Sequence, residues 1–557
     1  MGSGCALQTD ILIVGAGPTG LLLANLLGTM GVATTLIEKH QTTVQDPRAV
    51  SIDDESMRAL QAADLADDVA RIIVQGYGSI YRGPSGRSFA SVTPTTKDYG
   101  FDKRNAFEQP VFEGILRESL RRHPSLTVWF DTELVDFEQT NQTVQASVTC
   151  GGGPTQQIEA RYMIACDGGR SPVRKALGIA MDGASFAEPW LIVDLKNTLN
   201  RCFHTEVFCD PARSCITLPG PDGIRRYEFK LRVDENADSA LKEPFVRGLL
   251  ATVGPDRDQP LRRVRVYTFQ ARMANCWRQG RIFLAGDAAH LTPPFAGQGM
   301  NSGLRDAHNL AWKLAEALRC DQPEELLQSY ESERKPHAWS LICLAMQMGR
   351  VMMPQTPMRS VAIRSLFRLL NFYPPAREYV VQMKYKPKPR FAQGLVWHSD
   401  RARKKSVVGQ LLPQPFIQAV DRSVARLDEV LPDCPVLLIF SKTPETELLP
   451  DLQKQFSDAG IFVVGITPDS INPVLASFPI FRDQSRGLSK APYAAYVGYG
   501  LMIRRDRYVA AASPVSKLES LIEIGRRLSP GHSAPHTIKA MSPVKGADRQ
   551  QSIAKTA

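Results

Sequence analysis

The sequence predicts an α/β fold built on a Rossmann-like nucleotide-binding domain. Three observations support it: a strand–loop–helix–strand unit at the N-terminus, two later strands that each run into an acidic turn, and alternating strands and helices near the C-terminus. The length of 557 residues exceeds what one core supports, since cores stop growing near ~250–300 residues. We therefore expect two or three domains.

The N-terminal unit contains every part of a dinucleotide-binding motif in register. Residues 10–14 form a short apolar run, typical of a strand that is covered on both faces. The loop Gly15-Ala-Gly-Pro-Thr-Gly20 follows directly, then a helical stretch over 21–30 and a second strand over 33–37. This order predicts a complete βαβ unit.

Each glycine of this loop has a separate physical task. Gly15 permits the tight turn, Gly17 lets the backbone approach a pyrophosphate, and Gly20 allows the helix to pack closely on the strand. Glu38 ends the second strand, where a carboxylate can accept from a ribose hydroxyl. A lone GxGxxG is often only a glycine-rich turn, but with strand, helix and acid in register it predicts dinucleotide binding.

Two later segments repeat the pattern of a strand followed by an acidic turn. The strand over 161–166 runs into Asp167-Gly168-Gly169-Arg170-Ser171. The strand over 281–285 runs into Gly286-Asp287-Ala288-Ala289-His290, and the loop 293–303 then leads into an amphipathic helix. Taken singly, each Asp could be a turn residue, but their order after strands is specific.

Composition and charge exclude several other classes of protein. With 43% hydrophobic and 22% charged residues, the chain has a globular profile rather than a disordered one. The net charge of +10 is concentrated in the stretch 359–405 and in the tail 526–557, without a nucleic-acid-binding motif, so we expect no nucleic-acid partner. The uncharged run 11–37 is broken by glycines and a proline, so we expect neither a membrane span nor a secretory signal.

The ten cysteines form no CxxC pair and have no histidine at zinc-finger spacing. We therefore expect reduced thiols, a cytoplasmic protein and no metal site. The sequence does not determine the oligomeric state, for which a homodimer is one option.

Together these segments resemble the single-component FAD-dependent aromatic hydroxylases, a family of flavoprotein monooxygenases. Within it, the motifs look closest to those of the 3-(3-hydroxyphenyl)propionate hydroxylases. The resemblance covers roughly residues 8–515. Besides the glycine loop and the two acidic turns, it rests on Pro47-Arg48-Ala49, Ile52–Glu55, Arg104–Pro110, Arg225–Phe229, Arg263–Tyr267 and Ile503–Ala511.

The resemblance implies FAD as the bound cofactor and NAD(P)H as the reductant, with NADH and NADPH both open. Gly15, Gly17, Gly20 and Glu38 would hold the ADP half of FAD, and Arg48 and Gln109 would contact the cofactor. Asp167 and Gly168 would touch the pyrophosphate, and Asp287 would accept from the ribityl chain. The loop beside the isoalloxazine would comprise Pro294, Gly297, Gly299, Met300 and Asn301.

The resemblance also implies a domain organisation. An FAD-binding domain would comprise 1–75, 105–184 and 276–349, and an interleaved β-sheet substrate-binding domain 76–104 and 185–275. A basic helical connector would follow over 350–410, then a thioredoxin-like α/β domain over 411–528 and a disordered tail over 529–557. In the substrate-binding and thioredoxin-like domains, strands are expected at 191–195, 206–209, 226–231, 435–440, 461–465, 494–497 and 508–511.

The implied reaction is hydroxylation of a phenolic ring with NAD(P)H and O2 through a flavin 4a-hydroperoxide. Pro294 would line the reaction site, and candidates for activating the phenol are Tyr227, Tyr267, Arg225 and His204, each of which could equally be a packed or solvated residue. His290 is better interpreted as part of the acidic turn than as a base.

We expect a 3-hydroxyphenyl carboxylic acid such as 3-(3-hydroxyphenyl)propionate as the small-molecule substrate. Its carboxylate would be held by an arginine of the region 185–275, because a guanidinium grips a carboxylate with two parallel bonds. The candidates are Arg201, Arg213, Arg225, Arg226 and Arg232, which could instead face water or pair with Glu228 and Asp194. The alternatives are a polycyclic or polyketide- or quinolone-type aromatic substrate, and a nucleotide-binding protein without enzymatic activity.

Overall fold

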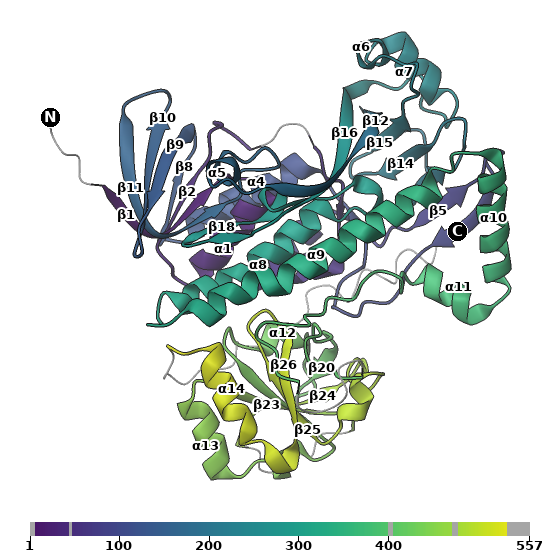
Figure 1. Ribbon diagram of the computed structural model, residues 1–557. Helices are drawn as coiled ribbons and strands as arrows, with labels where there is room; N and C mark the ends of the chain where they lie inside the picture. The colour runs from purple at the N-terminus through teal and green to yellow at the C-terminus, as the bar shows by residue number, and fades with distance from the viewer. Residues whose placement is uncertain (1–5, 44–46, 399–404, 470–476, 532–557) are drawn as a thin grey trace. The chain divides into compact units, whose positions relative to one another are not determined.

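The computed structural model describes residues 6–43, 47–398, 405–469 and 477–531 (Figure 1). The chain divides into two compact units. Unit 1 comprises residues 1–97, 101–311 and 334–387, and unit 2 comprises 98–100, 312–333 and 388–557. Of the tail expected to be disordered, 532–557 lies outside the described residues, whereas Ser529 is buried and donates to Glu316 in unit 2.

The first sheet of unit 1 has the strand order β17-β18-β11-β1-β2-β8. β1 (Leu7–Val14) pairs in parallel with both β2 (Thr34–Ile37) and β11 (Thr155–Ala165), and β11 pairs in parallel with β18 (Ile282–Leu284). Because parallel strands end at one edge of a sheet, the segments after β1, β11 and β18 meet there. The remaining strands are β8 (Leu126–Trp129), β9 (Thr132–Gln139), β10 (Val144–Cys150) and β17 (Arg278–Gln279).

Helices cover this sheet and supply its buried contacts. α1 (Pro18–Thr29) begins immediately after the glycine loop and is buried from Gly20 to Gly28. α4 (Gln109–Ser119) packs beside α1. Shorter elements complete the layer: β3 (Ser51–Ile52), α2 (Asp54–Ala62), α3 (Ala66–Ala70), β4 (Val74–Gln75), β7 (Asn105–Ala106) and α5 (Pro172–Ala176).

The second sheet of unit 1 is antiparallel apart from the β13–β5 pair, and is assembled from distant parts of the chain. Its order is β19-β16-β12-β15-β14-β13-β5-β6. The strands are β5 (Ser79–Arg82), β6 (Ser88–Val92), β12 (Met181–Leu195), β13 (Thr205–Phe208), β14 (Cys215–Pro219), β15 (Arg225–Lys230), β16 (Leu261–Ala274) and β19 (His290–Leu291). The strands expected at 191–195, 206–209 and 226–231 are confirmed to within a few residues.

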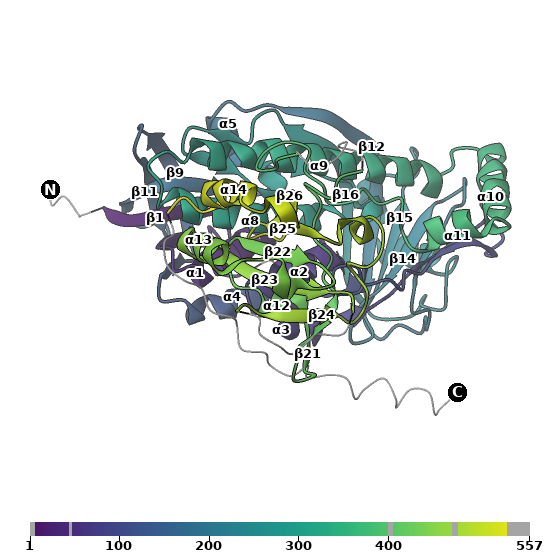
Figure 2. The same ribbon diagram turned by 90° about the horizontal axis from the view of Figure 1, so that it is seen from below.

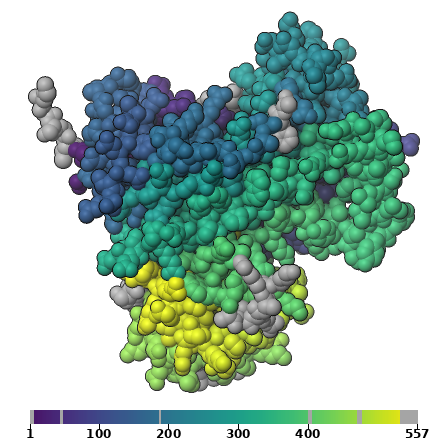
Figure 3. Space-filling model, in the orientation of Figure 1, coloured from purple at the N-terminus to yellow at the C-terminus, as the bar shows by residue number. Residues whose placement is uncertain are grey.

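The two faces of this second sheet bury different partners. One face packs against α6 (Ala237–Ala240) and α7 (Glu243–Leu250), which are labelled in Figure 1. The part of the chain that contains them forms the teal lobe at the top of Figure 3. The other face, which we call the pocket face, contacts Phe295 and the C-terminal half of α9 (Glu324–Met352). α10 (Pro357–Asn371) and α11 (Pro374–Val381) close its outer end beside β6, and both views show this pair of helices together (Figures 1 and 2).

Unit 2 contains a seven-stranded mixed sheet with the order β21-β20-β24-β23-β22-β25-β26. Its centre is parallel, and β25 and β26 add antiparallel strands, consistent with the expected thioredoxin-like α/β fold. Its elements are β20 (Phe416–Gln418), β21 (Val424–Arg426), α12 (Leu427–Val430), β22 (Val436–Phe440), α13 (Pro450–Asp458), β23 (Phe462–Thr467), β24 (Ile480–Asp483), β25 (Tyr499–Ile503), β26 (Val509–Pro514) and α14 (Ser520–Leu528).

One strand expected in unit 2 is wrong. Residues 493–496 form a 3-10 turn, and the strand begins later, at Tyr499. Gly498 has a positive φ of 85°, so the chain reverses there before β25 starts. Among the described residues, every helix is too short or too polar to cross a membrane.

Candidate active site

The glycine loop and Glu38 form one hydrogen-bonded structure at the end of β1. Glu38 Oε2 accepts from the backbone N–H of Ala16 at 2.8 Å, and Oε1 accepts from that of His40 at 3.0 Å. Gly15 has φ of +106°, and a Cβ there would lie 2.5 Å from the Cys166 carbonyl oxygen. The acid is therefore held beside the loop, where a bound ribose would meet it.

Gly17 and Gly20 differ in what a side chain would meet, and this gives a matched prediction. A Cβ on Gly20 would lie 2.0 Å from the Gly15 carbonyl oxygen, whereas a Cβ on Gly17 meets nothing within 4 Å. We expect Gly20→Ala to lower the melting temperature, because α1 must move away from β1. We expect Gly17→Ala to keep the melting temperature of the FAD-free protein but to weaken FAD binding. Equal FAD affinity in Gly17→Ala and wild type would contradict the pyrophosphate role of Gly17.

Two acidic side chains follow β11 and β18 at the same sheet edge. Asp167 Oδ2 accepts from the backbone N–H of Val173 at 3.2 Å, while Oδ1 is buried without a hydrogen-bond partner in the described part of the chain. Gly168 beside it has a φ of +83°. A buried acceptor without a donor costs free energy, so this oxygen is suited to a ligand that brings one.

The side chain of Asp287 is exposed to solvent, but it lies in a densely packed part of the protein that desolvates its carboxyl. Burial raises the pKa of its carboxyl, and the charges of His290 and Arg48 oppose that rise. Arg48 is also exposed. Because its charge acts on Asp287, the two predicted cofactor residues lie near each other. A carboxylate in this position suits the hydroxyl groups of a cofactor chain.

The side chain of Gln109 holds the segment that carries Arg48. Its Oε1 accepts from the backbone N–H groups of Arg48 at 2.7 Å and Ala49 at 2.8 Å, and its Nε2 donates to Glu113 at 2.7 Å. These bonds engage the side chain inside the protein. Gln109 therefore positions the Arg48 segment, and its contact with the cofactor stays a prediction.

The loop before α8 (Gly299–Ala317) is fixed by the side chain of Asn301. Asn301 Oδ1 accepts from Asp53 N at 3.0 Å and Ser56 Oγ at 2.7 Å, and Nδ2 donates to the carbonyls of Ser51 at 2.9 Å and Gly297 at 2.7 Å. Gly297 has φ of +62°, which a glycine adopts without strain. Pro294, Gly297, Gly299 and Met300 stay half-exposed, so their backbone is available to a ligand at the start of α8.

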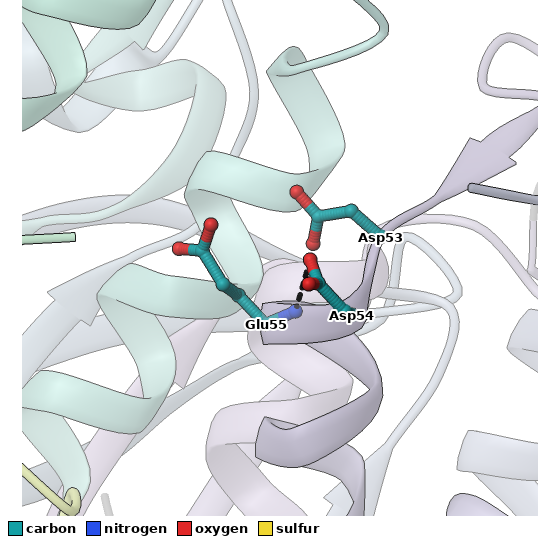
Figure 4. Close-up of side chains that lie close together, drawn as sticks. All are labelled: Asp53, Asp54 and Glu55. Atoms are coloured by element: carbon teal, nitrogen blue, oxygen red, sulfur yellow. Dashed lines mark hydrogen bonds between the residues drawn. The ribbon is translucent and has the colours of Figure 1, made fainter. Parts of the chain in front are cut away.

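An acidic triplet next to this loop is bound by two cations. Asp53, Asp54 and Glu55 lie within 4.8 Å of one another, measured between their ligand atoms, and point into the same region (Figure 4). Arg305 donates to Asp53 and Glu55, and Lys386 Nζ lies 2.9 Å from Asp53 and 2.7 Å from Glu55. The group is thus an ion-pair network that ties α2 and α8 to the segment after α11.

Tyr227 and Arg225, two of the predicted phenol-activating residues, lie on the face of the second sheet that α6 and α7 cover. Tyr227 is fully buried and donates to Asp256 at 2.8 Å. Arg225 is 1% exposed and is bonded to Thr217 and Glu206. Alternation along β15 points both away from the pocket face. This corrects the expectation, and both have structural roles in the sheet.

The pocket face contains a ring-lined apolar cluster, and Tyr267 belongs to it. Trp190 lies 5.7 Å from Phe295 and 5.8 Å from Phe269 between ring centroids. Tyr267 is opposite Trp190 in the β12–β16 register, which puts both side chains on the same face. The loop before α8, through Phe295, thus meets the sheet at an aromatic surface.

A charged group lies further along the same face, and in it Arg226 pairs with acids, the alternative to substrate binding that the sequence left open. Asp194 accepts from Arg226 Nε at 2.7 Å and from Arg263 Nε at 2.8 Å. Glu228 lies 4.0 Å from Arg226 and is buried. The alternation of side chains along β12, β15 and β16 predicts that these residues lie on the same face of the sheet as Trp190.

Glu228 gives a prediction for stability against pH. Burial raises its pKa to about 7; Asp194 adds to the rise, and Arg226 and Arg263 oppose it. Between pH ~4.5 and 7 the unfolded chain releases this proton while the folded protein keeps it, so wild-type stability falls over that window. A glutamine side chain cannot titrate, so Glu228→Gln should gain stability relative to wild type from pH 5 to pH 8 in urea unfolding. A constant difference across that range would contradict the raised pKa.

Comparison with known proteins identifies the family of this chain. Residues 8–345 match the family model described as an FAD binding domain. The chain is 35% identical over 507 residues to a 3-(3-hydroxy-phenyl)propionate/3-hydroxycinnamic acid hydroxylase of Klebsiella pneumoniae, covering 90% of this chain and 91% of that one. It is 38% identical over 511 residues to a protein of the same description from Mycobacterium sp. strain KMS, covering 90% and 88%.

Solved structures share the fold. The flavin-dependent monooxygenase PieE, in complex with FAD and substrate, superposes with a TM-score of 0.76 at 19% identity over 95% of this chain and 100% of that one. Aklavinone-11 hydroxylase, in a ternary complex with FAD and aklavinone, gives 0.74 at 21% identity over 95% and 100%. The chain therefore belongs to the FAD-binding-domain family of flavoprotein monooxygenases, and it is an FAD-dependent aromatic hydroxylase that uses NAD(P)H.

Proposed function

We propose that this hydroxylase acts on a 3-hydroxyphenyl carboxylic acid, with 3-(3-hydroxyphenyl)propionate and 3-hydroxycinnamate as the first candidates. The descriptions of the relatives at 35% and 38% identity support this substrate class. The structural observation that carries the proposal is the aromatic cluster of Trp190, Phe269 and Phe295, where the loop before α8 meets the pocket face. Such a surface accommodates a single substituted ring.

The residues at the sheet edge fit FAD. Gly17 leaves room for a pyrophosphate. The buried Asp167 Oδ1 has no hydrogen-bond donor in the described part of the chain, and the side chain of Asp287 is exposed to solvent. We propose that Glu38, Asp287 and the backbone at Gly297–Asn301 hold the adenosine ribose, the ribityl chain and the isoalloxazine. When bound, FAD accepts hydride from NAD(P)H and activates O2 for transfer to the ring.

Within this proposal, Tyr267 activates the phenol. Converting a phenol of pKa ~10 to phenolate at pH 7 costs about 4 kcal/mol, which the pocket must offset. Arg263 Nη1 donates to Tyr267 Oη at 3.4 Å, so the hydroxyl hydrogen of Tyr267 is free to donate to a substrate oxygen. Asp194 orients Arg263 through its bond at 2.8 Å. A charged donor behind the hydroxyl strengthens the bond to a phenolate.

This role predicts the behaviour of Tyr267→Phe. The variant loses one hydrogen bond to a charged oxygen, so kcat should fall ~10–150-fold at pH 7. Because the phenol must then ionise without help, the activity should recover as the pH is raised. The measurement is the pH profile of kcat. An unchanged profile would assign Tyr267 to packing alone.

A substrate panel tests the proposed function itself. Purified protein is assayed for stimulated oxidation of NADH and NADPH, with O2 consumption and the product mass, using 3-(3-hydroxyphenyl)propionate, 3-hydroxycinnamate, 3-ethylphenol and a fused polycyclic phenol. We expect the two acids to be the best effectors and to gain one oxygen. If the polycyclic phenol is better, the polycyclic alternative replaces this proposal.

We also propose that the protein works in the cytoplasm as a homodimer. The cysteines at nine described positions are free thiols, which is typical of a reducing compartment. Sedimentation of the FAD-loaded protein tests the dimer, and a purely monomeric species would contradict it.

A further inference from the structure

The arginines first expected to bind a carboxylate are already paired or exposed. Arg213 pairs with Glu235, Arg225 with Glu206, and Arg226 with Asp194. Arg201 and Arg232 are exposed. An arginine engaged by a buried protein carboxylate has little to offer a second one, so these residues do not account for selection of an acid substrate.

Arg104, just before β7, is in a different situation. Its Nη1 donates to Ser79 Oγ and its Nη2 to Tyr77 Oη at 3.3 Å, and its guanidinium lies 4.5 Å from the centroid of the Tyr77 ring. Among the described residues, its hydrogen bonds and its electrostatic partners are side chains of Ser and Tyr, and no carboxylate is among them. Since a guanidinium carries five N–H donors, three remain after these two bonds, including one on each Nη.

Neutral side chains surround this cation. Burial raises the pKa of Tyr81 well above its ordinary range, and burial also raises the pKa of Tyr385. Both phenols therefore stay uncharged at neutral pH and do not balance Arg104. Burial, followed by the charge of Arg104, lowers the pKa of His204, whose Nδ1 accepts from Gly78 N at 2.9 Å. A half-buried positive charge without a counterion favours binding of an anion.

Arg104 also lies at the edge of the pocket-face cluster. Tyr81, on β5, belongs to that cluster together with Trp190 and Phe295. Tyr385 lies between Met383, which packs on the cluster, and Lys386, which is bonded to Asp53 and Glu55. Lys386, a member of the ion-pair network, thus fixes the segment that carries Tyr385 beside Arg104.

We propose that Arg104 binds the carboxylate of the aromatic acid substrate and so selects acids over neutral phenols. This inference rests on the proposed function. The free N–H groups on Nη1 and Nη2 would bind the two carboxylate oxygens, with the ring directed along the apolar cluster toward Phe295. Tyr81 and Tyr385 would shape the site without competing for the anion.

The test compares acid with neutral substrates in Arg104→Met, Arg104→Lys and the control Arg87→Met, whose exposed side chain lies on the hairpin between β5 and β6. KM and kcat are measured for 3-(3-hydroxyphenyl)propionate and 3-ethylphenol, and binding of the acid is measured by calorimetry. We expect Arg104→Met to raise the KM for the acid ~10–150-fold and to leave that for 3-ethylphenol within about twofold. Arg87→Met should match wild type.

If Arg104→Met fails to fold, Arg104→Lys tests whether Arg104 binds the substrate carboxylate. It keeps the charge but loses the planar fork, so it should raise the KM for the acid severalfold without changing that for 3-ethylphenol. An equal loss for both substrates, or none for either, in a folded variant overturns the inference. If wild type oxidises neither substrate, the proposed function fails instead, and calorimetry still shows whether the acid binds through Arg104.

Discussion

Asp287→Ala is expected to lose most of its FAD during gel filtration. The wild-type carboxylate is exposed to solvent, and the charges of His290 and Arg48 favour its ionised form. Alanine removes an ionised acceptor, and hydrogen bonds to charged groups contribute about 1.5–3 kcal/mol. This corresponds to a ~10–150-fold larger dissociation constant for FAD.

Flavin titration of the FAD-free protein measures this constant directly, and the ratio of flavin to protein after gel filtration gives an independent reading. Asp287→Asn separates charge from shape and should fall between wild type and alanine. Asp234→Ala serves as the control, because Asp234 is an exposed aspartate in the region of the other sheet. If Asp287→Ala keeps full flavin occupancy, the residue does not hold the cofactor.

The sequence predicted the nucleotide-binding half of the fold because its information is local there. The run 10–14, the glycines and Glu38 follow one another within a single βαβ unit, and the structure places them as β1, the loop and the end of β2. The position of the acidic turns after β11 and β18 could also be predicted, since parallel strands bring their carboxyl ends to one edge of the sheet. The expected strand at 494–497 failed because Gly498 delays the strand to Tyr499.

The substrate side could not be predicted in the same way, because its side chains meet through long-range packing. Whether Tyr227 or Tyr267 faces the pocket depends on the register of β12 with β15 and β16. Among the described residues, the side chains around Arg104 are neutral, and this is visible only once β5, β7 and the segment around Tyr385 are assembled. An arginine-rich stretch indicates positive charge, but pairing decides which charge is left for a ligand.

Unit 2 depends on a buried ion-pair network around Glu333. Glu333 Oε1 accepts from Arg504 Nη1 at 2.6 Å and from Leu395 N at 2.9 Å, and Oε2 accepts from Lys313 at 2.6 Å and from Arg504 Nη2 at 2.8 Å. Asp506 pairs with the same arginine at 2.7 Å. Burial opposes ionisation of Glu333, but Arg504 and Lys313 outweigh it and lower its pKa to about 2.

Glu333→Gln should therefore destabilise unit 2 strongly, because Lys313 is left buried without its acid. Breaking such a pair costs about 3–5 kcal/mol, so we expect a clear fall in the thermal midpoint. The wild-type advantage is present above pH ~4.5 and is lost as the pH falls toward 2, so the two proteins should converge in acid. Asp458→Asn, which neutralises an exposed acid on α13, is the control. A penalty that stays constant down to pH 2 in circular-dichroism melts would show that the charge of Glu333 is not its source.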